Sequence, residues 1–303
     1  MKISVFYKKI VNKLIGKTFT FWQMLGFHIT PVHFYEPIPD TRRLKKELWQ
    51  KNSDMIGISL EEEKQIELLS AFVKKFKGEY DLFFGDKLSG ADGVNIKNSE
   101  FNSVDAEILY CMVRYLKPKN IIEIGSGCST IIMAKAIAKN KDEFGIECKL
   151  TTIDPYLKKF NKNEISSSFN SIEKEVQDVR LDEFNKLREN DILFIDSSHV
   201  LKIGSDVQYE YLEILPRLNK GVVVHSHDVF LPTEYPKEWV LKEHRFFNEQ
   251  YLLQAFLAFN KKFEVLWGGS YMHLKHKELL KNAFNSYNPD VNWPGSFWMK
   301  KIE

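Results

Sequence analysis

One stretch constrains this chain more than any other: two glycines, Gly125 and Gly127, directly follow a short apolar run at residues 121–124. A helical pattern resumes at Thr130, so the stretch predicts a strand, a tight turn and a helix. Unpaired N–H groups at the start of a helix, beside glycines that let the backbone approach a ligand, form a common cofactor site. Glu123, within the run, would meet a cationic or hydroxyl-bearing ligand group there. An ordinary strand-to-helix turn is the alternative.

A dinucleotide-binding fingerprint needs a third Gly or Ala three residues after the second glycine. Thr130 occupies that position in this chain. The fingerprint also expects an acid about 20 residues after its first glycine, but the next strand-end acid comes only at Asp154. A nicotinamide-dependent oxidoreductase is therefore an alternative with two observations against it.

Length and composition are those of a soluble globular protein. The 303 residues include 44% hydrophobic and 28% charged residues, with a formal net charge of +2, which predicts one domain with appendages or two small domains. Cys111, Cys128 and Cys148 show no C-x-x-C spacing and are typical of buried thiols in a reducing compartment. Neither a secretory signal pattern nor a long uncharged apolar span is present, so we expect no transmembrane helix and a cytoplasmic protein.

The amino-terminal region, residues 1–35, contains lysines but no acidic side chain. Its lysines alternate with apolar residues, which predicts a basic amphipathic helix. Such a helix could make peripheral contact with an anionic membrane or a partner, or be an ordinary surface helix. Residues 26–40 then contain three prolines before the final Asp and cannot form a regular helix. His28, His33 and Tyr35 in this extended segment are candidates for substrate contact, with plain packing as the alternative.

We expect an accessory amino-terminal region at residues 1–98 and a main domain at residues 99–303. Between them, residues 89–93 are rich in small residues and predict a loop. Within the accessory region, residues 41–77 have a helical apolar period. This region has too few apolar partners of its own for the extended aromatic segment, so we expect it to dock on the main domain rather than fold alone.

The main domain alternates predicted strands and helices, which is the pattern of a parallel α/β sheet. It begins with an amphipathic helix over residues 104–116, for which Ser103 is a plausible N-cap. A mostly apolar helix is predicted at residues 246–259, and the last two strands are expected to pair antiparallel. The predicted strands cover residues 121–124, 149–154, 172–179, 191–196, 221–225, 262–273 and 296–301.

Three of these strands end in or next to a carboxylate, at Glu123, Asp154 and Asp196. Ligands of open α/β sheets bind outside the carboxyl ends of the strands, so we expect these groups to converge. An acid after the second strand suits a ribose diol, and Asp178 after the third could meet an adenine amino group. Each acid alone has a simpler alternative, because acids often end strands merely for solvation.

Four motifs occur here in the order typical of class I S-adenosylmethionine-dependent methyltransferases, which the chain resembles over residues 26–301. They are Glu-Ile-Gly-Ser-Gly at 123–127, Thr-Ile-Asp at 152–154, Gln-Asp at 177–178 and Ile-Asp at 195–196. The chain is most similar to a subgroup found in sugar and polysaccharide modification. That similarity covers residues 28–40, Asp-Ser-Ser-His at 196–199, His-Ser-His-Asp-Val-Phe at 225–230 and Gly-Ser-Phe-Trp at 295–298. The resemblance implies an α/β, Rossmann-like sheet of seven strands, mostly parallel, with a final antiparallel hairpin.

The resemblance also implies that S-adenosylmethionine is the cofactor. Glu123, Gly125 and Gly127 would line its methionine part. Asp154 would bind the ribose hydroxyls and Asp178 the adenine. The complete implied cofactor site comprises Glu123, Gly125, Ser126, Gly127, Ser129, Thr130, Asp154 and Asp178.

A second resemblance, to metal-dependent catechol-type O-methyltransferases, implies a catalytic cluster. That family holds a divalent cation with an Asp after strand four and an Asp-Asn pair after strand five, and the matching residues are Asp196, His227 and Asp228. His199 falls where that family has a catalytic lysine. His227 departs from the family's Asp, and two carboxylates with one His suit Mn, Fe or Zn better than Mg. A polar cluster without a metal is the alternative.

The predicted chemistry is O-methylation of a small-molecule, sugar or polysaccharide hydroxyl. A hydroxyl is a poor nucleophile at neutral pH, so it needs a base such as His199, with Asp196 and Asp228 beside it, or a metal that lowers its pKa. His225 and Tyr235 are further candidates for substrate contact. We expect no nucleic-acid partner, and a homo-oligomer stays open. A non-catalytic protein that binds the cofactor within an assembly is the alternative.

Overall fold

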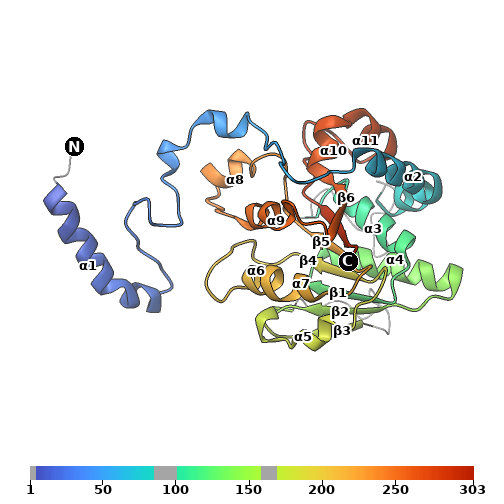
Figure 1. The fold of residues 1–303 in the computed structure, drawn as a ribbon, viewed down its shortest axis with the longest axis horizontal. Helices are drawn as coiled ribbons and strands as arrows, with labels where there is room; N and C mark the ends of the chain where they lie inside the picture. The colour runs from blue at the N-terminus through green and yellow to red at the C-terminus, as the bar shows by residue number, and fades with distance from the viewer. Residues whose placement is uncertain (1–4, 85–100, 158–168) are drawn as a thin grey trace. The chain divides into compact units, whose positions relative to one another are not determined.

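The computed structural model describes residues 5–84, 101–157 and 169–303, with side chains from residue 13 onward. The chain forms two compact units (Figure 1). The smaller unit consists of Met1–Lys51 and Pro236–Phe246, and the larger unit of Asn52–Tyr235 and Phe247–Glu303. The loop predicted at residues 89–93 lies outside the described residues, so the expected boundary near residue 98 stays a prediction.

The larger unit is built on a single sheet (Figure 1). In the described residues it has seven strands in the order β3-β2-β1-β4-β5-β7-β6. β7 runs antiparallel to both of its neighbours, and the other pairs are parallel. This confirms the predicted mostly parallel α/β sheet with a reversed final strand. The strands are β1 Asn120–Ile124, β2 Lys149–Ile153, β3 Phe169–Ile172, β4 Ile192–Ile195, β5 Val223–Ser226, β6 Phe263–Gly268 and β7 Phe297–Lys301.

Each central strand sends alternate side chains into two separate cores. On β4, Ile192 and Phe194 belong to one core, whereas Leu193 and Ile195 belong to the other. All four are buried. A parallel strand covered on both faces needs apolar residues at every position, which explains why the sequence of this strand is continuously apolar.

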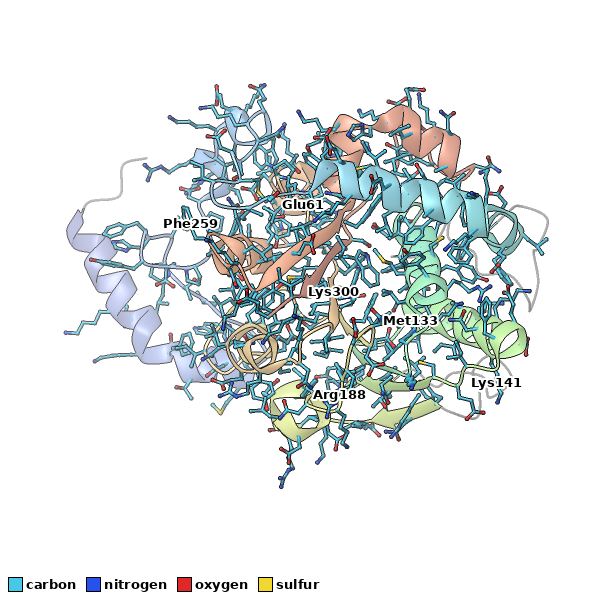
Figure 2. The ribbon with its side chains drawn as sticks, turned by 45° about the vertical axis from the view of Figure 1, so that its right-hand side comes forward. Glu61, Met133, Lys141, Arg188, Phe259 and Lys300 are labelled. Carbon is cyan, nitrogen blue, oxygen red and sulfur yellow. The ribbon has the colours of Figure 1, made fainter. Side chains whose placement is uncertain are left out.

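Helices cover both faces of the sheet, as their membership of the two cores shows. The first core contains residues of α2 Glu62–Phe84, α3 Asp105–Leu116, α4 Cys128–Phe144, α10 Gly269–Lys275 and α11 Lys277–Ala283. The second contains residues of α5 Leu181–Phe184, α6 Asp206–Tyr209, the π-helix η5 Glu210–Ile214, α7 Leu215–Arg217 and α9 Glu249–Leu257. Figure 2 labels Met133 and Lys141 on α4; the first is fully buried and the second is exposed.

A buried arginine joins three of these helices. Arg114 on α3 is 1% exposed. Its Nε donates to Oε2 of Glu79 on α2 at 2.8 Å, and its Nη2 donates to Oε1 of the same carboxylate at 3.0 Å. It also donates to Asn140 and Glu143 on α4. The amino-terminal half of the chain thus contributes α2 to the larger unit and its core.

Two predicted strands have different boundaries in the structure. The third predicted strand, 172–179, is wrong: β3 ends at Ile172, and Val176–Asp178 form the 3-10 helix η4. β3 lies at the edge of the sheet and is half exposed, so it lacks the apolar pattern that marks the central strands. The sixth strand was predicted too long, since β6 ends at Gly268 and α10 begins at the next residue.

Three helix predictions also need correction. The region 41–77 contains two 3-10 turns, η1 Thr41–Arg43 and η2 Lys46–Trp49, and only then α2. The helix expected at 246–259 is the shorter α9. α3 begins at Asp105 with Val104, not Ser103, as its N-cap. Val104 has φ 75°, and its N–H donates to the Glu107 carboxylate at 2.7 Å, so the acid supplies the cap from inside the helix.

Candidate active site

The carboxyl ends of the central strands lie in one row because backbone pairing continues past each strand. The N–H of Gly125 donates to Ile153 O at 2.9 Å. The N–H of Asp196 donates to Ile124 O, and that of His227 to Ile195 O, each at 3.0 Å. The residues that follow β1, β4 and β5 are therefore held side by side at the edge where ligands of such sheets bind.

The two glycines of the first turn serve different purposes. Gly125 has φ 95°, and a Cβ there would lie 2.2 Å from the carbonyl oxygen of Asp196. Only glycine allows this approach between the turn and the end of β4. A Cβ on Gly127, in contrast, would meet nothing within 4 Å. The turn therefore leaves open space beside Gly127, at the amino terminus of α4.

The carboxylate of Glu123 lies beneath this turn. Its residue is 0% exposed, and its two oxygens accept hydrogen bonds from Ser129 Oγ at 2.6 Å and Thr130 Oγ1 at 2.7 Å. Thr130 Oγ1 in turn accepts from the N–H of Gly127 at 3.0 Å. Burial raises the pKa of Glu123 to about 8, against the opposing effect of the two hydroxyls. These hydrogen bonds link the turn to the first turn of α4, and a contact of Glu123, Ser129 or Thr130 with the cofactor stays a prediction.

The acids of the next two strand ends are more accessible. Asp154 is half-buried; its Oδ2 accepts from the hydroxyl of Ser126 and its Oδ1 from the N–H of Tyr156 at 2.7 Å. Asp178 is exposed, at the end of η4. Next to it, Oε1 of Gln177 is buried without a hydrogen-bond partner. A buried acceptor of this kind normally has a donor, so the position is suited to a ligand N–H.

Four polar side chains gather after β4 and β5. His199 Nε2 lies 3.4 Å from Asp196 Oδ1 and 3.5 Å from Asp228 Oδ2. His227 Nδ1 lies 3.5 Å from Asp196 Oδ1 and 3.6 Å from Asp228 Oδ1. Both imidazole rings therefore face the same two carboxylates. The carboxylates are the accessible members, since the side chain of Asp196 is 32% exposed and that of Asp228 is 17% exposed.

A buried acid holds the far side of His199. The ring Nδ1–H donates to Oε2 of Glu249 at 2.8 Å, and Oε1 of the same carboxylate accepts from the Tyr211 hydroxyl at 2.8 Å. The carbonyl of His199 also accepts from the N–H groups of Asn248 and Glu249 at 3.0 and 3.2 Å. Both the ring and the backbone of His199 are thus fixed by the start of α9. This fixation sustains the left-handed φ of 59° at His199.

Asp105 occupies the corresponding position behind His227. Its Oδ2 lies 3.8 Å from His227 Nε2, and its two oxygens accept from the N–H groups of Gly295 and Ser296 at 2.8 and 3.0 Å. Phe101 stacks on the same imidazole, with ring centroids 4.6 Å apart. The second histidine is therefore also fixed from the side opposite the exposed carboxylates.

Charge in the cluster is distributed unevenly. Burial lowers the pKa of His199 and of His227, but the surrounding carboxylates raise both well above the ordinary value. Burial raises the pKa of Asp196, yet the two histidines hold it well below the usual range. Burial raises the pKa of Asp228 and outweighs the same histidines, so its pKa is above the usual value. Of the two accessible carboxylates, Asp228 binds a proton more readily.

The residues predicted to contact substrate lie in several places. His225 is 0% exposed and stacks against Phe194, with centroids 3.9 Å apart. Tyr235 is 2% exposed, and its hydroxyl accepts from the N–H of Gln250 at 3.0 Å. Both side chains are part of the interior of the larger unit. His28, His33 and Tyr35 belong to the smaller unit and are exposed, and a role in substrate binding stays a prediction for all five.

A metal ion at Asp196, His227 and Asp228 also stays a prediction. These residues lie together, but among the described residues no group of three or more His, Cys, Asp or Glu side chains is arranged to hold a metal ion. The contacts between them are imidazole-to-carboxylate contacts of 3.5 and 3.6 Å. Because protons on the two rings can satisfy the carboxylates, we derive no chemical step from a metal.

Glu249 and Asp105 were not predicted as site residues from the sequence. Glu249 lies within a stretch read only as an apolar helix, and Asp105 is an ordinary acid in the first turn of α3. Neither forms a spaced motif with the histidine that it holds. The one available signal is that both acids are almost fully buried, at 1% and 4% exposure, which becomes visible only in the folded chain.

Residues 122–229 match the family model of a methyltransferase domain. An uncharacterized protein of Archaeoglobus fulgidus is 29% identical over 198 residues, which cover 62% of this chain and 82% of that protein. The matched methyltransferase model and the strand order support the resemblance to class I S-adenosylmethionine-dependent methyltransferases. Membership of the sugar-modifying subgroup stays a prediction.

Three solved structures show a lower degree of similarity. An apo structure of CmcI is 13% identical and covers 67% of this chain and 72% of its own, with a TM-score of 0.39. An SAH-bound methyltransferase of Podospora anserina is 15% identical. The similarity covers 91% of this chain and 100% of that one, with a TM-score of 0.38. An O-methyltransferase from Bacillus cereus in complex with SAH is 14% identical. The similarity covers 80% of this chain and 91% of that one, with a TM-score of 0.35. Similarity this low carries no part of the assignment.

Proposed function

We propose that this methyltransferase acts on a hydroxyl group of a small molecule, a sugar or a polysaccharide. The observation that carries the proposal is the pair of His199 and Asp228, held next to the glycine turn with Glu249 behind the imidazole. An amine or thiol acceptor is already nucleophilic and needs less help, whereas a hydroxyl must lose its proton as it reacts. A built proton-accepting pair therefore favours a hydroxyl acceptor.

Two observations support S-adenosylmethionine as the cofactor. The space beside Gly127 is open, and the buried Oε1 of Gln177 has no partner. In this proposal the glycine turn binds the methionine part of the cofactor. Asp154 accepts a hydrogen bond from a ribose hydroxyl in place of the one from Ser126. Gln177 and Asp178 contact the adenine. When bound, S-adenosylmethionine supplies the electrophilic methyl group.

Proton removal is the step that we assign to His199 and Asp228. Nε2 of His199 lies 3.4 Å from Oδ1 of Asp196 and 3.5 Å from Oδ2 of Asp228. Burial lowers the pKa of His199, but the surrounding carboxylates raise it well above the ordinary value, so the neutral ring is a strong base whose Nε2 accepts the hydroxyl proton. Glu249 keeps Nδ1 protonated and so keeps Nε2 directed at the acceptor. Asp196 stabilises the imidazolium that forms.

Turnover assays with His199→Gln and Glu249→Gln test this assignment. We expect formation of S-adenosylhomocysteine to fall by roughly 10²–10⁴-fold in His199→Gln, with cofactor affinity measured by calorimetry nearly unchanged. Glu249→Gln should lower kcat by a smaller factor, because the ring stays in place but loses its fixed tautomer. His276→Gln is the matched control. His276 Nε2 lies 2.9 Å from Glu62 Oε1 and is not part of the cluster after β4 and β5.

The acceptor class is tested by a panel of alcohols, sugars, amines and thiols at equal concentration. Turnover confined to hydroxyl acceptors supports the proposal. Equal turnover with amines in wild type and in His199→Gln would refute it. Cofactor binding without turnover on any class would favour the alternative of a non-catalytic binding protein.

A further inference from the structure

The first 35 residues are not used by the proposed chemistry, and their charge is one-sided. They contain the lysines Lys2, Lys8, Lys9, Lys13 and Lys17 and no acidic residue. Most of them form α1, Val5–Met24, a helix of 20 residues in the smaller unit. Figure 1 draws α1 at the blue end of the chain, followed by an extended segment. No helix among the described residues is long and apolar enough to cross a membrane.

The described side chains of α1 combine aromatic, aliphatic and basic groups. Ile15, Phe19 and Trp22 follow one another at helical spacing on one side of the helix. Leu14 and Phe21 lie two turns apart, on the side that also bears Lys17. Lys13 and Lys17 are spaced four residues apart, so ammonium groups lie next to apolar side chains along the helix.

The apolar side chains of this region are exposed. Leu14 is 57% and Phe21 52% exposed on the helix. In the segment after it, Phe27 is 64%, Phe34 81% and Tyr35 82% exposed. Soluble monomers rarely expose so many large apolar side chains in one stretch. The same region continues with further exposed apolar residues at Met24, Leu25, Val32 and Ile38.

We propose that residues 13–35 bind the surface of an anionic lipid bilayer. Aromatic and aliphatic side chains enter the boundary between headgroups and acyl chains, while lysines contact the negative headgroups, which is how interfacial amphipathic helices bind. Lysine stems suit this position because their methylene groups can lie along apolar surface with the charge in water. Exposed rings such as Phe34 and Tyr35 add the amphipathic aromatic contacts favoured at that depth.

Charge favours a lipid surface over a second copy of this chain. Pairing this region with itself would bring together two groups of lysines with no carboxylate in either stretch, and like charges at a contact oppose association. An anionic bilayer offers negative headgroups to the lysines and an acyl-chain region to the apolar side chains. Each lysine near such a surface contributes attraction that salt screens.

Sedimentation with lipid vesicles tests the proposal on the full-length protein. We expect binding to phosphatidylcholine vesicles that contain phosphatidylglycerol, little binding to pure phosphatidylcholine, and weakening as salt is raised. The double variant Lys13→Glu/Lys17→Glu should bind roughly 10–100-fold more weakly. Phe21→Ser should weaken binding to a similar extent. The matched control is Lys45→Glu/Lys46→Glu, which makes the same charge change in the same unit.

Other outcomes would overturn the proposal. Absence of vesicle binding, or equal loss in the control variant, would show that this stretch is not a lipid-binding surface. Sedimentation equilibrium without lipid addresses the second copy: an oligomer that Phe21→Ser dissociates would assign these apolar side chains to self-association instead. Calorimetry with S-adenosylhomocysteine on each variant verifies that the larger unit is folded, and it keeps this test separate from that of the methyl-transfer proposal.

Discussion

Residues at the sheet edge act together: each histidine faces accessible carboxylates on one side and has a buried acid behind it. His199 faces two accessible carboxylates, while Glu249 behind it is 1% exposed. The same relation holds between the open turn at Gly127 and the buried Glu123. A reactive or ligand-binding group needs a fixed direction, and the buried acid supplies that direction at the cost of its own desolvation.

The cost should be measurable at Glu123. Its pKa is raised from 4.5 to about 8, so the native state keeps a proton that the unfolded chain releases. The stabilisation is complete below about pH 4.5 and is lost as pH rises to about 8. Within that window the free energy of unfolding should fall by about 1.4 kcal/mol per pH unit from this group.

Urea unfolding at several pH values, without cofactor, checks this expectation. Glu123→Gln keeps a neutral side chain at all pH values, so its stability should decline less between about pH 6 and about pH 8 than that of wild type. Glu183→Gln, at a side chain that is 41% exposed, is the control and should follow wild type. Parallel curves for wild type and Glu123→Gln would show that Glu123 does not carry the proton.

Sequence spacing was sufficient to predict the residues at the strand ends and insufficient to predict the buried acids behind them. Asp196, His227 and Asp228 directly follow predicted strands, so the parallel sheet alone brings them to one edge. Glu249 reaches His199 from a helix 50 residues further along the chain. Because no period or motif encodes that distance, contacts of this kind depend on how helices pack, which the sequence pattern leaves undetermined.

At the scale of elements, the turn after β1 offers a matched pair of glycine variants. In Gly125→Ala the added Cβ would meet Asp196 O at a left-handed φ of 95°, so we expect the free energy of unfolding to fall by about 2–4 kcal/mol. Gly127→Ala has free space and should change stability by less than about 0.5 kcal/mol. The methyl group that Gly127→Ala adds lies in the proposed cofactor site, so the affinity of this variant for the cofactor should fall. Thermal unfolding and calorimetry separate the two effects.

The junction of α2, α3 and α4 depends on Arg114. Removing its guanidinium leaves Glu79 and Glu143 without their partner, but their side chains are 22% and 45% exposed and become hydrated. The loss is therefore smaller than for a fully buried ion pair, about 1–3 kcal/mol. We therefore expect a loss of that order in Arg114→Ala, measured by urea unfolding. Arg180→Ala is the control, since Arg180 is 85% exposed and its surface pair with Asp182 should contribute little to stability. Equal losses in both variants would contradict this view.

Elements buried on both sides were the easiest to predict from sequence. β4 is a continuous apolar run, and β1 and β5 are almost fully buried strands that each begin with or contain a pair of β-branched apolar residues. β3 at the edge and the junction of β6 with α10 were misplaced, because local apolar pattern is weak where a strand is exposed or passes directly into a helix. Edge geometry depends on pairing partners more than on the strand itself.

At the scale of the whole molecule, the division into two units predicts which truncations fold. Residues 52–303 keep α2, whose Leu69, Phe72 and Tyr80 are buried in the first core. We expect this fragment to unfold cooperatively on heating. Residues 99–303 lack α2 and leave the partners of these side chains exposed, so this fragment should be unfolded or aggregated. Circular dichroism melting of both fragments checks the prediction, and a stable 99–303 fragment would contradict it.

The smaller unit is assembled from two stretches that lie far apart in the gene. It combines residues 1–51 with residues 236–246, and Lys237 of α8, Lys237–Leu241, lies over the ring of Trp49 at 5.9 Å from its centroid. A recombination event that exchanges only the first stretch with a relative would therefore pair a foreign segment with a resident one. In chimaeras made with one crossover between these stretches, the smaller unit should not fold. In chimaeras that exchange both stretches together, it should fold.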